Sequence, residues 1–494
     1  MRIYETLLSL ANFLTFCILV IPRLRVIHWM GYLVLITVLM AGIQILVEGP
    51  RWQMVPAYAL SLIFFLIWLL GIIIPGGIHI NRLFSGACVG VGVLALIVSN
   101  ALPLVLPVFH FPHPSGPYRI GTMTYHWVDT SRDEIFSTDP NAHRELIVQI
   151  WYPAKENSSA SATYVQDAGV LSPVLARLAH LPEFTFNYFK YVTTDASPSV
   201  PMATDKPNYP VLIFLEGLNG FRQMNTFQVE ELVSHGYIVA AIDQPYAAAS
   251  VVFPDGHYIT GLTKDQMEPF TQQSINPVEK APILNGQALK NGEIPYFAQD
   301  VSFTLDQLTA LDKTDPDGIL TGRLDLQHIG TFGISLGAMV ASEAGHKDPR
   351  LKACLLMDAA MPADVVQAGL QQPSMWITRD ADTMRLERQR AGGWPEWAIT
   401  QTLTTMRKVF NKSLPGDGYY VQVPGMFHLN FTDTPYFSPL APLMGFAGPI
   451  NAQRAFDIVN AYSLAFFDHH LKGRLATLLD VPTLQYPEVL FEKR

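Results

Sequence analysis

The sequence predicts an α/β domain with a mostly parallel sheet covered by helices, preceded by a four-helix transmembrane segment. Three observations support this fold class. The first 112 of the 494 residues carry only five arginines and two glutamates, and are otherwise free of charged side chains. Later residues alternate short β-branched runs with helical stretches, which is typical of a parallel sheet. A Gly-x-Ser-x-Gly motif stands directly after one of these runs.

Four long apolar runs lie near the start of the chain, at about 6–22, 30–47, 55–75 and 84–108. Each is close to the ~20 residues that a helix needs to cross ~30 Å of hydrocarbon. We therefore expect residues 1–110 to form a transmembrane segment of four helices in a multi-pass membrane protein. An even number of spans puts both termini on one side, and a margin of one arginine between the loops favours an extracytoplasmic position for the rest of the chain.

The remainder of the chain is acidic. The whole sequence has a formal net charge of −9 and its first 112 residues are net +3, so the rest is −12. Such a domain argues against nucleic acid as a partner and leaves the bilayer as the expected macromolecular one. Three cysteines, Cys17, Cys88 and Cys354, do not predict a disulfide framework. The oligomeric state is left open.

Residues 111–117 form a Pro-rich linker in this prediction, and residues 118–494 form the second domain. His110 and His113 lie at this linker, but two histidines without a carboxylate or thiol partner do not predict a metal site. We expect no metal and no cofactor.

Seven runs in the second domain are predicted strands: 146–152, 211–215, 237–242, 328–332, 353–357, 374–378 and 419–423. They are apolar almost throughout, as expected for strands that are buried on both faces. Ligands of such sheets bind at the carboxyl ends of the strands, so chemically active residues should follow these runs directly.

The motif Gly333-Ile-Ser335-Leu-Gly337 follows the run 328–332 and precedes a helix-compatible stretch. This strand-turn-helix setting is that of the nucleophile elbow in the α/β-hydrolase fold. The serine of an elbow lies on a sharp turn, and the flanking glycines let the strand and helix backbones approach closely. We therefore predict an α/β-hydrolase fold with Ser335 as the nucleophile.

A serine hydroxyl needs a nearby base that is itself oriented by a carboxylate, and in this fold the chain order is Ser, then acid, then His. Four histidines follow Ser335. His346 is too close to the serine, whereas His469 and His470 fall in an amphipathic terminal helix. His428 stands in the loop after the last predicted strand and is the predicted base.

Two aspartates are candidates for the acid. Asp358 ends the run 353–357, and Asp382 stands just past the run 374–378. Both are at the carboxyl ends of neighbouring strands, and either is within reach of a histidine on the next loop. Physical reasoning alone leaves this choice open.

Four blocks of sequence carry a resemblance to a known family: 146–153; 217–222 with 234–241; 324–329 through the elbow; and 357–361 with 428–433. Over roughly residues 118–475 the chain resembles platelet-activating factor acetylhydrolase and the related dienelactone-hydrolase-like lipases. In that family the acid follows the serine by about two dozen residues in an Asp-Ala-x-Met block. The resemblance therefore implies Asp358 as the acid, with Asp382 as the alternative.

The tetrahedral intermediate of ester cleavage needs backbone N–H donors aimed at its oxyanion. Leu336, next to the serine, is one predicted donor, and the resemblance implies Leu218 as the second. Two positions depart from the family, because Glu216 and Ile334 replace its usual histidines. We expect Glu216 to place an anionic carboxylate near the oxyanion loop and so to alter substrate preference.

The predicted function is a membrane-anchored serine esterase or lipase that hydrolyses short-chain carboxylic esters of lipids or lipid-like molecules. The resemblance implies the 1-alkyl-2-acetylglycerophosphocholine esterase type. The alternatives are a polyester hydrolase or peptidase on the same fold, and a non-catalytic membrane sensor with a hydrolase-like binding domain. Residues 388–411 form either a lid or a packed surface helix, and the long excursion 246–297 is expected to cap the pocket.

Overall fold

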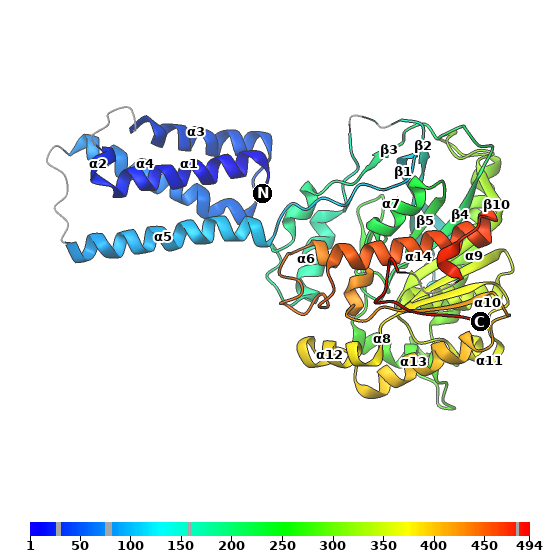
Figure 1. Ribbon diagram of the computed structural model, residues 1–494. Helices are drawn as coiled ribbons and strands as arrows, with labels where there is room; N and C mark the ends of the chain where they lie inside the picture. Colours follow the sequence, from blue (N-terminus) through cyan, green and yellow to red (C-terminus); the bar gives the residue numbers. More distant parts are fainter. Residues whose placement is uncertain (26–30, 75–81, 157, 159, 481–483) are drawn as a thin grey trace.

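The computed structural model describes residues 1–25, 31–74, 82–156, 158, 160–480 and 484–494. An elongated bundle of N-terminal helices projects from a larger, rounded domain (Figure 1). The bundle contains α1 (Ile3–Val20), α2 (Pro22–Arg25), α3 (Tyr32–Val47), α4 (Val55–Ile73) and α5 (Arg82–Val105), with the 3₁₀ turn η2 (Trp52–Met54) before α4.

Three segments of the described bundle are long and apolar enough to cross a membrane: Ile3–Val20, Trp52–Ile73 and Leu83–Val105. The second predicted span is present as α3, which has 16 residues. The prediction of four spanning helices is therefore not confirmed in full. Residues 30 and 75, at the ends of two predicted spans, lie outside the described residues.

A buried ion pair lies where the bundle meets the second domain. Arg51 Nε is 2.6 Å from Glu5 Oε1, and both side chains are almost fully buried. Arg51 Nη1 also donates to the carbonyl of Leu106, just beyond α5 (2.6 Å). The adjacent Trp52 donates from Nε1 to the carbonyl of Thr185 in the second domain (3.2 Å). These bonds join three helix ends of the bundle to one another and to the second domain.

Among the described residues, ten strands form one sheet in the order β14-β13-β12-β11-β10-β4-β5-β2-β1-β3. Neighbours from β13 through β12, β11, β10 and β4 to β5 are all parallel. In chain order the strands are β1 (Arg119–Asp133), β2 (His143–Ala154), β3 (Ala196–Pro198), β4 (Tyr209–Leu215), β5 (Ile238–Asp243), β10 (Leu324–Ile334), β11 (Leu351–Met357), β12 (Ser374–Thr378), β13 (Gly418–Gln422) and β14 (Leu490–Lys493).

The prediction of a mostly parallel sheet is confirmed, and each of the seven predicted runs falls on one of its strands, with 237–242 and 419–423 each extending one residue beyond the strand. Strands β1, β3 and β14 are absent from the prediction. All three lie at or next to the edges of the sheet, where strands are half exposed or very short.

Helices cover both faces of the sheet (Figure 1). On one face lie α7 (Thr226–Ser234) and α14 (Ala452–Lys472); on the other lie α9 (Ile294–Lys313), α10 (Leu336–Lys347), α11 (Ala363–Ala368) and α13 (Glu396–Phe410). The excursion after β5 holds the hairpin β6 (Ser250–Val252) and β7 (Tyr258–Thr260), α8 (Lys264–Ile275), and the hairpin β8 (Ile283–Leu284) and β9 (Gln287–Ala288). The remaining elements are α6 (Ala168–Leu178), α12 (Ala381–Ala391), η3 (Asn187–Tyr191), η4 (His428–Phe431), η5 (Thr434–Tyr436) and η6 (Thr477–Leu479).

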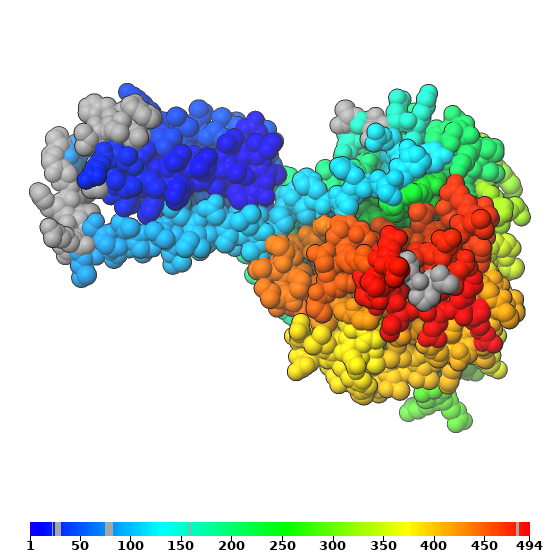
Figure 2. Space-filling view, in the orientation of Figure 1, coloured from blue at the N-terminus to red at the C-terminus, as the bar shows by residue number. Residues whose placement is uncertain are grey.

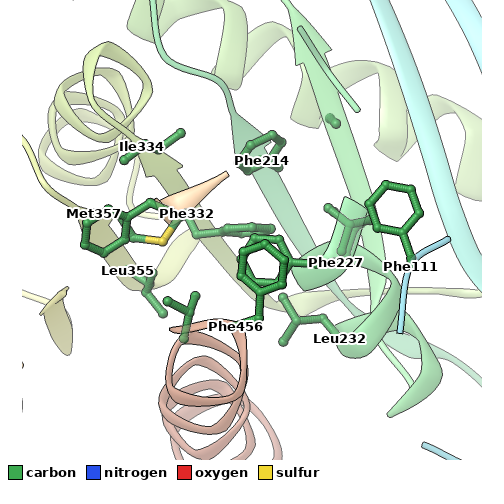
Figure 3. Packing of buried hydrophobic residues seen from close by; sticks show 14 of the residues in the cluster. Phe111, Phe214, Phe227, Leu232, Phe332, Ile334, Leu355, Met357 and Phe456 are labelled. Carbon is green, nitrogen blue, oxygen red and sulfur yellow. The ribbon is translucent and has the colours of Figure 1, made fainter. Parts of the chain in front are cut away.

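Aromatic side chains fill the core on the α14 face. The rings of Phe227 on α7 and Phe456 on α14 stack with centroids 3.9 Å apart. Phe332 and Ile334 of β10 belong to the same buried cluster (Figure 3). Ile334, directly before Ser335, therefore packs as part of the core.

The predicted linker is packed against the second domain. Phe111 and the preceding Phe109 are buried in the same core, and both rings contact Tyr164. Farther along, His113 Nδ1 lies 3.0 Å from Asp195, but its side chain is 91% exposed. The chain therefore passes from the bundle to the sheet along a fixed route, in continuous contact with the larger domain (Figure 2).

Candidate active site

Ser335 lies at a sharp turn between β10 and α10. Its backbone has φ 56° and ψ −124°, a conformation that non-glycine residues rarely adopt. The Ser335 N–H donates to the carbonyl of Met357 at the end of neighbouring β11 (2.9 Å). The serine is thus held in a strained turn at the carboxyl edge of the sheet.

The two motif glycines are required by close backbone contacts. A Cβ atom on Gly337 would lie 2.1 Å from the carbonyl oxygen of Leu215, at the end of β4. A Cβ atom on Gly333 would lie 2.5 Å from the backbone carbonyl of Gly337. Neither backbone can retreat without moving a central strand, so only glycine fits at these two positions.

The structure joins Asp358 to His428. Asp358 directly follows β11 and is fully buried. Its Oδ2 accepts a hydrogen bond from His428 Nδ1 (2.6 Å), and its Oδ1 accepts one from the Thr378 hydroxyl (2.9 Å). Because the carboxylate accepts from Nδ1, the imidazole keeps Nε2 as its free acceptor.

Asp358 is held in its ionised form. Burial alone would raise the pKa of this carboxyl, but the Arg379 guanidinium and the hydrogen bond from His428 outweigh burial and hold the pKa well below its usual value of 3.8. Asp358 is therefore an anion at neutral pH, which strengthens the hydrogen bond that it accepts from His428.

The alternative acid lies elsewhere. Asp382 is in the first turn of α12, its side chain is 92% exposed, and it pairs with Arg385 (3.1 Å). Of the two candidate acids, Asp358 is the one that contacts His428 in the described structure.

The sheet register brings Ser335 to the same edge. Ile334 of β10 pairs with Met357 of β11, so the residues that follow them, Ser335 and Asp358, are neighbours at the carboxyl ends of two adjacent strands. No hydrogen bond joins the Ser335 hydroxyl to another side chain among the residues that the structure describes. Catalytic hydrogen bonds are often long in ligand-free structures and tighten only with substrate bound.

Both predicted oxyanion donors are available. Within the described part of the chain, the backbone N–H groups of Leu218 and Leu336 donate to no other group. Leu336 is the first residue of α10, where a helix leaves its N–H groups unpaired. The loop of Leu218 lies against the serine, since a Cβ on Gly217 would be 3.1 Å from Ser335 Cβ.

Glu216 is buried at the end of β4, directly before the oxyanion loop. Its side chain is buried, one oxygen accepts from the Gln244 N–H (3.3 Å), and the other has no partner among the described residues. Burial, together with the nearby Asp243 carboxylate, raises the pKa of Glu216 well above 4.5. Burial beside Asp243 thus favours the protonated form of Glu216, whereas the sequence analysis expected an anionic carboxylate beside the oxyanion loop.

Three residues that the sequence did not reveal surround the Asp358–His428 pair. Arg379 is fully buried and its Nε is 2.8 Å from Asp358 Oδ2. Its Nη1 pairs with Glu387, which in turn accepts the backbone N–H of His428 (3.1 Å). The Trp394 ring lies 4.7 Å from the Arg379 guanidinium and 4.9 Å from the His428 ring.

The segment 388–411 is a packed helix with a short connection before it. Helix α13 buries Ile399, Met406 and Val409 against the domain, so the packed alternative holds for this helix. Trp394 comes from the connection between α12 and α13. This part of the segment, rather than the helix, reaches the candidate site.

Comparisons with known proteins agree with the geometry. A protein from Arthroderma benhamiae, named a probable 1-alkyl-2-acetylglycerophosphocholine esterase, is 26% identical over 81% of this chain and 98% of its own. The platelet-activating factor acetylhydrolase of Canis lupus familiaris is 22% identical over 67% of this chain and 72% of its own. The structure of a ferulic acid esterase from Streptomyces cinnamoneus superposes with a TM-score of 0.59 and 28% identity, covering 78% of this chain and all of the other.

The sheet order, the covering helices and the strand-turn-helix motif define the fold as that of an α/β-hydrolase, and the chain is a carboxylic ester hydrolase. The sequence profile of the platelet-activating factor acetylhydrolase, isoform II, family matches residues 106–476, and the chain belongs to that family.

We predict that Gly337→Ala removes most esterase activity and destabilises the protein. The added Cβ would press on the Leu215 carbonyl, and such overpacking costs about 1–3 kcal/mol. Thermal unfolding and ester hydrolysis measure the two effects. Gly169→Ala in α6 is the matched control, because a Cβ there meets open space. Wild-type activity and melting temperature in Gly337→Ala would contradict the requirement for a close backbone approach.

Proposed function

We propose that the chain is a membrane-anchored serine esterase that hydrolyses short-chain esters of lipids through Ser335, His428 and Asp358. The observation that carries the proposal is the 2.6 Å hydrogen bond from His428 to the buried Asp358 at the strand edge that also holds Ser335. The domain that does this comprises residues 118–494 in our proposal, and residues 1–110 anchor it.

In the first half of the reaction, Ser335 Oγ attacks the ester carbonyl and His428 Nε2 takes its proton. Asp358 keeps the imidazole in the required tautomer and stabilises the imidazolium that forms. The backbone N–H groups of Leu218 and Leu336 bind the oxyanion. The intermediate then expels the alcohol, which takes the proton from His428 and leaves an acyl-enzyme.

In the second half, His428 takes a proton from water while the water oxygen attacks the acyl carbonyl. Collapse of this intermediate breaks the bond to Ser335, whose oxygen recovers the proton from His428. The products are an alcohol and a carboxylic acid. Burial beside Asp243 raises the pKa of Glu216 and so favours its protonated form, which suits this cycle, since an anion near the oxyanion would oppose the charge that develops there.

The names of the relatives support a lipid substrate. Two of them are named for esters of alkyl-acetyl-glycerophosphocholine or platelet-activating factor. The match to the first of these extends over 98% of that protein's length. A bundle of apolar helices joined to the domain would hold the enzyme beside a lipid pool. We therefore propose short acyl chains on glycerophospholipids as the substrate class.

The bundle supports a membrane anchor in a second way. Its interior carries hydrogen-bonded polar groups: Asn12 donates to the Ala57 carbonyl (3.1 Å), and the hydroxyls of Thr15 and Thr37 are 2.8 Å apart. Its outer surface is apolar, including Leu10, Phe13, Leu39, Ile63, Val91 and Leu94, each about half exposed or more. Apolar residues outside and paired polar residues inside are typical of helices packed in lipid.

We predict that Ser335→Ala abolishes hydrolysis of short-chain nitrophenyl esters by the purified protein. Asp358→Asn should lower kcat by about 10⁴, because the histidine loses its orienting carboxylate. Asp382→Asn is the control and should stay within twofold of the wild type. Undiminished hydrolysis in Ser335→Ala would refute the nucleophile and would favour a non-catalytic binding domain with contaminating activity. Equal losses of kcat in Asp358→Asn and Asp382→Asn would refute the assignment of Asp358 as the acid.

The substrate class is tested by comparing kcat/KM for four substrates: an acetyl glycerophosphocholine, a long-chain phosphatidylcholine, a feruloyl ester and a peptide amide. We expect the acetyl phospholipid to be preferred by at least tenfold, and this activity to vanish in Ser335→Ala. A preference for the feruloyl ester or the peptide amide would contradict a lipid substrate while leaving the serine mechanism in place.

We expect the full-length protein to stay in the membrane pellet after alkaline carbonate extraction, since helices inserted in hydrocarbon resist it. We further propose an extracytoplasmic domain, so protease added to intact cells should degrade residues 118–494. A cytoplasmic protein of the same cells, intact in the same sample, is the control. Release by carbonate would contradict the anchor, and protection from protease in intact cells would place the domain on the inner side.

A further inference from the structure

Arg379 occupies a costly position. It directly follows β12, is fully buried, and has an N–H group, at Nη2, that makes no hydrogen bond with the described residues. Buried donors without acceptors are unfavourable, and apolar residues often replace buried ion pairs without loss of stability. Packing alone therefore gives no reason for an arginine here.

The contacts of Arg379 all lead to the candidate acid and base. On one side its Nε faces Asp358 Oδ2, the oxygen that accepts from His428. On the other side its Nη1 pairs with Glu387, which holds the backbone N–H of His428 (3.1 Å). The Arg379 guanidinium thus connects to His428 in two ways: to the imidazole through Asp358, and to the backbone N–H through Glu387.

Trp394 closes this cluster. Its ring covers the Arg379 guanidinium at 4.7 Å and the His428 imidazole at 4.9 Å. An aromatic face over a cation is attractive, and a ring over both groups keeps water from the ion pair. Arg379, Glu387 and Trp394 all come from the stretch 379–394, which follows a different strand from either Asp358 or His428.

We propose that Arg379 is a positioning residue for ester hydrolysis, which fixes Asp358 directly and the backbone of His428 through Glu387. The proposal rests on the proposed function of Ser335, Asp358 and His428. Arg379 touches neither the ester nor the serine in this account. Its effect is on the geometry and charge of the pair that activates the nucleophile.

The test uses full-length Arg379→Met, which keeps an unbranched side chain, although a shorter one, and removes its charge. A displaced base costs up to about 10²-fold, so we expect kcat to fall about 10- to 100-fold with KM within twofold. Without the cation the protonated imidazole is favoured, so the acid limb of the kcat/KM profile should move up by about one pH unit. The variant keeps the other charged neighbours, Asp358 and Glu387. Burial raises the pKa of Tyr420, on adjacent β13, to about 12, so this group does not titrate near the acid limb.

Arg350→Met is the matched control, because Arg350 also pairs with two carboxylates, those of Asp348 and Asp306, but lies apart from the site. It should leave kcat and the pH profile unchanged. Titration of active sites with a phosphonate inhibitor gives kcat per folded molecule, so a loss of folded protein does not count as a loss of rate. A kcat within twofold of the wild type, with an unmoved acid limb, would overturn the proposal.

Two milder variants decide the question if Arg379→Met does not fold. Arg379→Lys keeps the charge but cannot span both carboxylates, so it should restore the acid limb while kcat stays about tenfold low. Glu387→Gln keeps an acceptor for the His428 N–H but loses its hold on Arg379, and should lower kcat several-fold. Wild-type kcat in both would overturn the proposal. Failure of the proposed function itself is distinguishable, because hydrolysis would then survive in Ser335→Ala.

Discussion

The arrangement of the site depends on one close backbone contact, that of the start of α10 with the end of β4. Gly337 lies so near the Leu215 carbonyl that a methyl group would not fit. Ser335, two residues before Gly337, has an unusual backbone conformation, and Leu336 begins α10 with an unpaired N–H. The loop that continues from β4 lies against the serine at Gly217. The proposed nucleophile and oxyanion donors therefore lie together where α10 approaches β4.

The register of the parallel strands extends this constraint across the sheet. Ile334 of β10 pairs with Met357 of β11, which pairs with Ile377 of β12. The residues that come next therefore form a row at the carboxyl edge: Ser335, Asp358 and Thr378. Arg379 continues from the last of these, and His428 arrives from the loop after β13. Sheet order alone brings residues that are nearly a hundred positions apart in sequence into one cluster.

Much of this was predictable from the sequence, because buried parallel strands are apolar throughout and the serine motif marks one strand end. Strand β1, next to one edge of the sheet, could not be predicted, since its half-exposed residues lack a continuous apolar run. The acid was open on physical grounds, as Asp358 and Asp382 both follow strands, and the structure separates them by burial and by the bond to His428. The role of Arg379 could not be predicted, because the sequence does not distinguish a buried arginine from an exposed one. The raised pKa of Glu216 depends on burial, which no local pattern encodes.

The most direct test of this account is covalent labelling of the full-length protein with a fluorophosphonate, followed by mass mapping of the modified peptide. The account predicts one label per chain, on Ser335, with hydrolysis lost in proportion to labelling. It also predicts no labelling in Ser335→Ala and slow labelling in Asp358→Asn, because the serine is then poorly activated. A label on another residue that accounts for the lost activity would contradict it, as would full inhibition with Ser335 unmodified.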